Sequence, residues 1–155
     1  MNKAVFLGAV LLLLSLAIRA ETIILNLEEP KADATYTGIS NLRGWAVAES
    51  GVAAIEIDID GVYAFDVPMG GTRGDVASAY PDFPDAKTSG FSMAFNYKGL
   101  APGEYLFTAR VISNDGGVAL QTAAVTVDRF VSSFIDDAAK VDTTTVSEVL
   151  FAEST

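Results

Sequence analysis

The stretch AAIEIDIDGVYAFDV, residues 53–67, decides the fold class of this chain. Isoleucines at positions 55, 57 and 59 alternate with acidic residues, so the pattern predicts a strand with an apolar face toward a core and an acidic face toward water. Asp60-Gly61 is a turn pair that tolerates the left-handed backbone region, and residues 62–67 return as the second strand of a hairpin. We therefore expect an antiparallel sheet with one buried face.

Five further segments have the apolar content and the alternation of strands. They are residues 22–27, 42–48, 91–97, 104–113 and 118–127. Turns rich in glycine, proline, asparagine or aspartate separate them, and no segment shows a convincing helical period. About seven short strands joined by turns predict an all-β fold, an antiparallel β-sandwich that occupies residues 21–127.

The composition excludes several classes of chemistry. The 155 residues include no histidine and no cysteine, which removes disulfides, thiolate nucleophiles, Ser-His-Asp triads and most zinc and haem sites. An enzyme built from this chain would depend on carboxylates, lysine or tyrosine for proton transfer. Ten basic residues against twenty acidic ones, with no basic cluster, argue against binding nucleic acid or an anionic membrane.

The first twenty residues differ in composition from the rest. Lys3 precedes an apolar run over residues 4–18, and Ala20 is a small residue suited to a cleavage site, so residues 1–20 are predicted to be a secretory signal peptide. An uncleaved N-terminal anchor is the alternative. Cleavage would leave eight basic and twenty acidic residues, a net charge of −12. It would place the chain in the periplasm, outside the cell or at the cell surface.

Residues 128–155 fit the strand pattern less well. They mix apolar residues such as Phe130 and Phe134 with acidic residues and three successive threonines. The segment is predicted to be either a tail or an additional strand. An additional strand could add to an exposed sheet edge of a neighbouring copy, so the sequence leaves homo-oligomerisation open.

Several short motifs occur in a defined order along residues 22–127. They are Gly44-Trp45-Ala46, Gly51-Val52, residues 55–61, Arg73-Gly74-Asp75-Val76, Ala79-Tyr80-Pro81, Ser89-Gly90-Phe91, residues 100–105 and Asn114-Asp115-Gly116. In this order and spacing they resemble the bacterial Ig-like domains of secreted and surface proteins. The resemblance implies a seven-stranded sandwich without catalytic machinery that serves as a spacer, an adhesion module or a ligand-binding module. Analogy of fold does not identify the ligand.

The segment 68–89 contains three prolines and no sustained periodicity, which predicts a long loop. Long loops in compact domains are usually functional or well packed on themselves. We expect this loop to tuck Tyr80 and Phe83 inward. The candidate ligand-binding residues of the loop are Arg73, Asp75, Tyr80 and Phe83.

Calcium is the one cofactor for which the sequence offers candidate ligands. Asp75, Asp82 and Asp85 lie in the long loop, and a flexible loop can gather the oxygen ligands that calcium prefers. Alternatively, Asp75 pairs with Arg73, and the other two are ordinary turn residues beside prolines. Residues 56–61 also place carboxylates at alternate positions, but a valine stands where a calcium loop needs its twelfth-position glutamate. A solvated strand face is therefore favoured there.

Two aromatic residues are assigned to structural roles. Trp45 alternates in phase with Val47 between small residues, which predicts a place in the sandwich core rather than a sugar-stacking platform. Tyr105 follows a Pro-Gly turn at the start of a strand, and we predict that its hydroxyl bonds back to the backbone as a corner tyrosine.

These observations leave three functions of different classes. The favoured one is a secreted, non-enzymatic Ig-like domain that binds a protein or glycan, or has a structural role, at the cell surface. Its loop 68–89 would do most of the work. The first alternative is a carbohydrate-binding module that uses the same loop, with or without calcium. The second is a hydrolase with paired carboxylates, but an open acidic strand face neither raises a carboxyl pKa nor excludes water.

Overall fold

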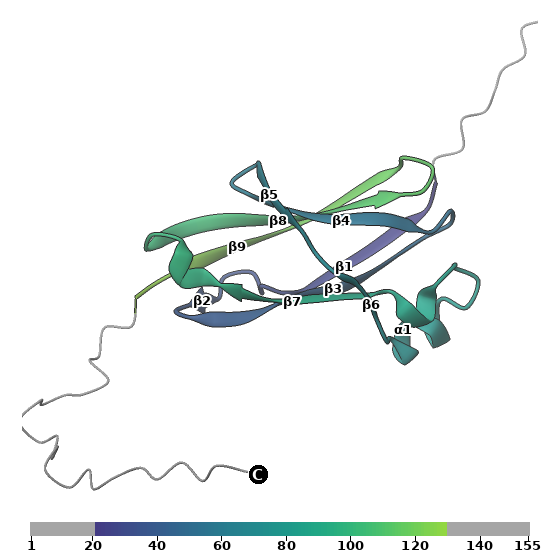
Figure 1. Ribbon diagram of the computed structural model, residues 1–155, viewed down its shortest axis with the longest axis horizontal. Coiled ribbons are helices and arrows are strands. Elements are labelled where there is room, and N and C mark those ends of the chain that lie inside the picture. The colour runs from purple at the N-terminus through teal and green to yellow at the C-terminus, as the bar shows by residue number, and fades with distance from the viewer. Residues whose placement is uncertain (1–20, 130–155) are drawn as a thin grey trace, which may run out of the picture.

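Two β-sheets pack face to face in the computed structural model, which describes residues 21–129 (Figure 1). One sheet has four strands in the order β1 (Ile23–Glu29), β3 (Ile39–Ala48), β7 (Gly90–Asn96) and β6 (Met69–Gly71). The other has five strands in the order β2 (Thr35–Tyr36), β9 (Val118–Val127), β8 (Gly103–Ser113), β4 (Val52–Ile59) and β5 (Val62–Asp66). Neighbouring strands are antiparallel, apart from β2, which runs parallel to β9.

The strand order identifies the type of sandwich. In an Ig fold, strands A, B, E and D form one sheet, strands G, F and C form the other, and some members add C′ beside C. The four-stranded sheet matches A-B-E-D, and β9, β8, β4 and β5 match G-F-C-C′. The predicted Ig-like β-sandwich is therefore confirmed.

Seven of the nine strands in the described part correspond to the seven that the sequence predicts. The two additional strands, β2 and β6, contain two and three residues, too few for an alternating pattern to be recognised. The predicted signal peptide and the part of the predicted tail from residue 130 onward lie outside the described residues. Within residues 21–129, no helix is long and apolar enough to cross a membrane.

The core lies between the two sheets and contains the apolar side of the predicted alternation. Ile55 and Ile57 are buried there, and the largest fully buried side chains include Phe91, Tyr97 and Phe107. The ring of Phe107 lies 5.6 Å from the ring of Tyr97, measured between centroids. Burial of this aromatic group raises the pKa of the Tyr97 hydroxyl, which has no hydrogen-bond partner among the described residues.

Two predicted turn features are confirmed. Asp60 and Gly61 both have positive φ angles, 51° and 78°, as the turn between β4 and β5 requires. The Tyr105 hydroxyl donates a hydrogen bond to the carbonyl oxygen of Ala101 at 3.1 Å. Tyr105 therefore forms the predicted corner at the start of β8.

The prediction that segment 68–89 is a loop without regular structure is wrong. The segment begins with β6 and continues through helix α1 (Gly74–Ala79) and a 3-10 turn, η1 (Ala86–Thr88). Val76 is the one buried residue of the six in α1, and a helix this short shows no recognisable 3.6-residue period. A second 3-10 turn, η2 (Tyr97–Gly99), connects β7 toward β8.

The prediction that Trp45 lies in the sandwich core is also wrong. Trp45 is half-buried and belongs to a second apolar cluster with Val47, Val76 and Ala86, separate from the core between the sheets. The sequence correctly predicts that Trp45 and Val47 lie on the same side of the strand. That side is the outer face of the four-stranded sheet, not the core face. The part of the outer face around Trp45 and Val47 is apolar because α1 and η1 pack against it, and α1 lies beside this end of the sheet in Figure 1.

Candidate functional site

Arg73 and Asp75, two of the predicted ligand-binding residues, bind each other. Arg73 Nε donates a hydrogen bond to Asp75 Oδ1 at 2.9 Å, and Arg73 Nη2 donates one to Asp75 Oδ2 at 2.6 Å. The same Nη2 atom lies 2.9 Å from Oε1 of Glu28 on β1. The guanidinium carbon lies 5.9 Å from the centre of the Trp45 ring, within the range of a cation–π contact. Arg73 therefore fastens the start of α1 to the four-stranded sheet.

Tyr80 and Phe83, the other two candidates, pack inward as the sequence predicts. Tyr80 lies 5.5 Å from Trp45 and 6.0 Å from Phe83, measured between ring centroids, and the contact with Phe83 is edge-on. Both side chains are half-buried in the second apolar cluster. Their aromatic faces thus contribute to the packing of segment 72–89 on the sheet.

The three aspartates predicted to bind calcium are not grouped. Asp75 is bonded to Arg73, and Asp82 and Asp85 are exposed. Among residues 21–129, no three or more Asp, Glu, His or Cys side chains are arranged to hold a metal ion. Calcium binding by this segment stays a prediction.

The ion pair with Arg73 determines how Asp75 titrates. The hydrogen bonds from Arg73 lower the pKa of the Asp75 carboxyl group to about 2, from an ordinary value of 3.8. A carboxyl group whose pKa is lower in the folded protein than in the unfolded chain stabilises the fold above its unfolded pKa. That stabilisation is lost as the pH falls through the folded value.

Replacing Asp75 with asparagine should therefore weaken the dependence of stability on pH between about pH 4 and pH 2. The wild-type melting temperature should fall more steeply across this window than that of Asp75→Asn, because only the wild type loses the ion pair there. Thermal unfolding followed by circular dichroism at several pH values measures the difference. Asp82→Asn, at an exposed aspartate of the same segment, is the matched control. Equal slopes for the two variants would contradict the prediction.

The two sheets differ in what covers their outer faces. Segment 72–89 packs on the outer face of the four-stranded sheet, and the one α-helix in the described part lies there (Figure 1). Of the seven large apolar side chains that are exposed in residues 21–129, five lie on strands of the other, five-stranded sheet. The five-stranded sheet thus holds most of the large apolar side chains that are exposed in the described part of the chain.

Four of these side chains point away from the core on the five-stranded sheet. They are Leu120 (60% exposed), Val118 (56%), Tyr63 (55%) and Leu106 (42%). We call the outer face of this sheet the open face and define it by these four residues. An exposed apolar surface on one side of a sandwich is suited to contact with another molecule.

An ionic group lies in the middle of the open face. Arg110 on β8 pairs with two carboxylates of the neighbouring strand β4, at 3.4 Å from Glu56 and in closer contact with Asp58. Asp58 is 3% exposed, and its Oδ1 atom has no hydrogen-bond partner among the described residues. Leu120 stands opposite Arg110 on β9, so the apolar and ionic groups are adjacent.

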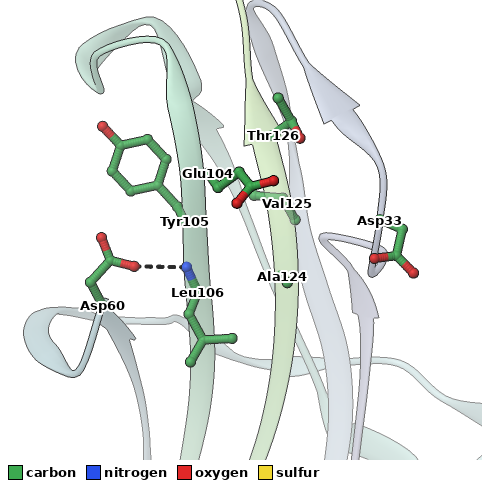
Figure 2. Close-up of a pocket in the computed structure, with 8 residues that line it drawn as sticks. All are labelled: Asp33, Asp60, Glu104, Tyr105, Leu106, Ala124, Val125 and Thr126. Carbon is green, nitrogen blue, oxygen red and sulfur yellow. Dashed lines mark hydrogen bonds between the residues drawn. The ribbon is translucent and has the colours of Figure 1, made fainter.

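An acidic groove of about 340 Å³ lies at one end of the open face (Figure 2). Carboxylates of Asp33, Asp60 and Glu104 line it together with Leu106. Figure 2 shows Asp60 beside β8 and Asp33 on the far side of β9, and Asp60 Oδ1 accepts a hydrogen bond from the backbone nitrogen of Leu106 at 2.8 Å. Asp60 therefore has a fixed position at the edge of the groove.

Sequence reasoning missed the open face. It placed the candidate site in segment 68–89, whose aromatic residues pack against the four-stranded sheet instead. A pattern that indicates the open face is present in β8, where the side opposite the core includes Leu106 and Ile112 as well as Arg110. Two large apolar residues on the solvent side of a strand exceed what alternation alone requires.

The chain resembles known proteins only distantly. No protein-family model matches the chain, and no curated protein matches it. Among solved structures, it is similar to the endo-β-1,4-mannanase of Thermotoga petrophila (10% identity, TM-score 0.48), over 73% of this chain and 21% of the mannanase. It is also similar to fibronectin(III)-like modules of Clostridium thermocellum CbhA (12% identity, TM-score 0.43), over 71% of this chain and 47% of that one.

A third similar structure is CopC from Methylosinus trichosporium OB3b, with 19% identity and a TM-score of 0.42 over 73% of this chain and 100% of that chain. The chain thus spans about a fifth of the mannanase and about half of the CbhA structure. At these levels of identity and TM-score the likenesses say nothing about role. The class of the protein is accordingly defined by its own strand order, an Ig-like β-sandwich module.

Proposed function

We propose that this protein is a non-enzymatic, Ig-like binding module, secreted or held at the cell surface, that recognises a protein partner through its open face. The observation that carries the proposal is the concentration of exposed large apolar side chains, among residues 21–129, on the sheet that α1 and η1 do not cover. Surfaces of this kind, bordered by polar residues, typically bind other proteins. The localisation rests on the signal-peptide pattern of residues 1–20.

The bonding of the carboxylates on the open face supports a binding role over a catalytic one. Glu56 and Asp58 are held by Arg110, and Asp66 accepts a hydrogen bond from the Tyr63 hydroxyl at 3.2 Å. Asp60 accepts one from the backbone. Groups engaged in this way hold a surface in shape, whereas a general acid or base needs a free bond to its substrate and a site that excludes water.

A protein partner is favoured over a glycan. Sugar-binding surfaces present aromatic rings side by side toward solvent, and the aromatic residues of segment 68–89 pack on Trp45 instead. The open face offers one exposed ring, Tyr63, among aliphatic side chains. Apolar side chains with polar groups around them form the arrangement of contacts between proteins, which have an apolar centre and a polar rim.

Site-specific photo-crosslinking in the host cell tests the proposal. The full chain would be produced with p-benzoylphenylalanine at position 120 on the open face or, as a matched control, at position 39. Ile39 is more accessible than Leu120, at 73% against 60% exposed, but belongs to the four-stranded sheet. We expect a discrete protein adduct from position 120 and none from position 39. No adduct from position 120, or the same adduct from both positions, would contradict the proposal.

A further inference from the structure

The charges around the open face restrict what can bind there. The carboxylates of Asp33, Asp60, Asp66 and Glu104 border its apolar residues. Within residues 21–129, no lysine or arginine forms an ion pair with any of these four. Arg110 is committed to Glu56 and Asp58. The border of the open face therefore carries negative charge that the described part of the chain does not neutralise.

A second copy of this chain does not fit this surface. The whole chain has a net charge of −10, so two open faces placed together would bring unneutralised carboxylates against each other. Like charges across an interface oppose association. Residues 130–155 fit no better, because their sequence contains five acidic residues and one lysine.

We infer that the open face binds a polypeptide segment that is both basic and apolar. Its apolar side chains would cover Leu106, Val118 and Leu120, and its lysine or arginine residues would approach Asp60, Asp66 and Glu104. This inference rests on the proposed function and adds the chemistry of the partner to it. The unneutralised carboxylates provide the attraction, and the aliphatic side chains provide most of the contact area.

The strength of exposed ion pairs determines what a binding experiment should detect. Each exposed ion pair changes an affinity by about fivefold at most, so no single carboxylate should dominate the affinity. Their combined field steers association and is screened by salt, because the Debye length shrinks below about 10 Å as the ionic strength rises above 0.1 M. We therefore expect the affinity to depend strongly on the salt concentration. We also expect the bound segment to contact the open face.

Titrating the ¹⁵N-labelled full chain with two peptides tests the inference by nuclear magnetic resonance. One peptide alternates leucine with lysine, and the matched peptide alternates leucine with glutamate. We expect the lysine peptide to shift amide resonances of β8 and β9, and its dissociation constant to rise about tenfold between 50 and 300 mM NaCl. The glutamate peptide should cause no shifts there.

Two double variants with equal loss of charge separate a local effect from a general one. Asp60→Asn with Glu104→Gln removes two carboxylates of the open face, and asparagine retains the acceptor for the Leu106 amide. Asp82→Asn with Asp85→Asn removes two exposed carboxylates of segment 68–89. We expect the double variant at Asp60 and Glu104 to weaken binding of the lysine peptide about fivefold. The double variant at Asp82 and Asp85 should leave the binding unchanged. The spectrum of each free variant shows whether it is folded.

The outcomes distinguish this inference from the proposed function. Equal shifts of the same amides with both peptides would mean that the open face binds without regard to charge, which overturns the inference and leaves the proposed function standing. Equal weakening by both double variants, or no shifts at all with the lysine peptide, would also overturn it. The proposed function itself is contradicted by the crosslinking experiment, if position 120 gives no adduct or if positions 120 and 39 give the same one.

Discussion

Replacing Phe107 with alanine should lower the free energy of unfolding by about 3–5 kcal/mol, the range typical of a large aromatic residue removed from a core. Phe107 is fully buried, and its ring lies 5.6 Å from the rings of both Phe95 and Tyr97, measured between centroids. Removing the Phe107 ring would thus leave a cavity between the two sheets, among the remaining aromatic rings. Domains of this size have a total stability of about 5–15 kcal/mol, so the variant loses a large part of it. Urea denaturation followed by circular dichroism measures the change.

Leu106→Ala is the matched control for this prediction. Leu106 is the preceding residue on β8, but its side chain points to the open face and is 42% exposed. Its truncation should cost less than about 1 kcal/mol, because much of its surface is already in water. A similar cost for the two variants would mean that β8 does not separate a core face from a solvent face. A loss of partner binding in Leu106→Ala without loss of stability would in turn support the role of the open face.

The fold could be predicted from the sequence because its determinants are local. The isoleucines at 55 and 57 set the inward face of β4, and Asp60 with Gly61 sets the turn that follows. Tyr105 forms its corner with a residue four positions earlier. Each of these features depends on the alternation of apolar and polar residues or on the backbone angles of a few neighbouring residues. Both can be recognised in a single sequence.

The long segment could not be predicted in the same way, because its structure depends on contacts distant in sequence. Arg73 is held by Glu28, and Tyr80 packs on Trp45, both from strands that precede it by more than thirty residues. The apolar residues Trp45 and Val47 on the outer side of β3 are explained by the packing of α1 and η1 against them. The sequence displays that Trp45 and Val47 share a face, but not which face it is.

The candidate site was missed for a related reason. The sequence draws attention to unusual residues, such as the arginine, aspartates and aromatics of segment 68–89. The open face is built from ordinary strand residues, Leu106 on β8 and Val118 and Leu120 on β9, which become a surface only when the strands pair in register. Within residues 21–129, α1 and η1 pack on the opposite sheet and not on the open face. A single strand such as β8 can show apolar residues on its solvent side, but not which of the two sheets α1 and η1 pack against.

Replacing Gly44 with alanine should destabilise the protein by about 1–3 kcal/mol through overpacking. Gly44 lies on β3 between β1 and β7, opposite Leu27 on one side and Phe91 on the other. A methyl group there would lie 2.5 Å from Cζ of the Phe91 ring and even closer to the backbone carbonyl oxygen of Asn26. The Phe91 ring is fully buried and the carbonyl belongs to a paired strand, so neither can move without disturbing the core. The midpoint of urea denaturation reports the loss.

Gly38→Ala provides the matched control, with an effect of the opposite sign. A methyl group at Gly38 would have no other atom within 4 Å. Alanine restricts the unfolded chain more than glycine does, so this variant should be unchanged or more stable by up to about 1 kcal/mol. The pair therefore separates the general effect of replacing a glycine from the close approach of β1 and β3. If Gly44→Ala were as stable as Gly38→Ala, the two strands and the Phe91 ring could not be packed as closely as the structure has them, and the four-stranded sheet would need a different register at this position.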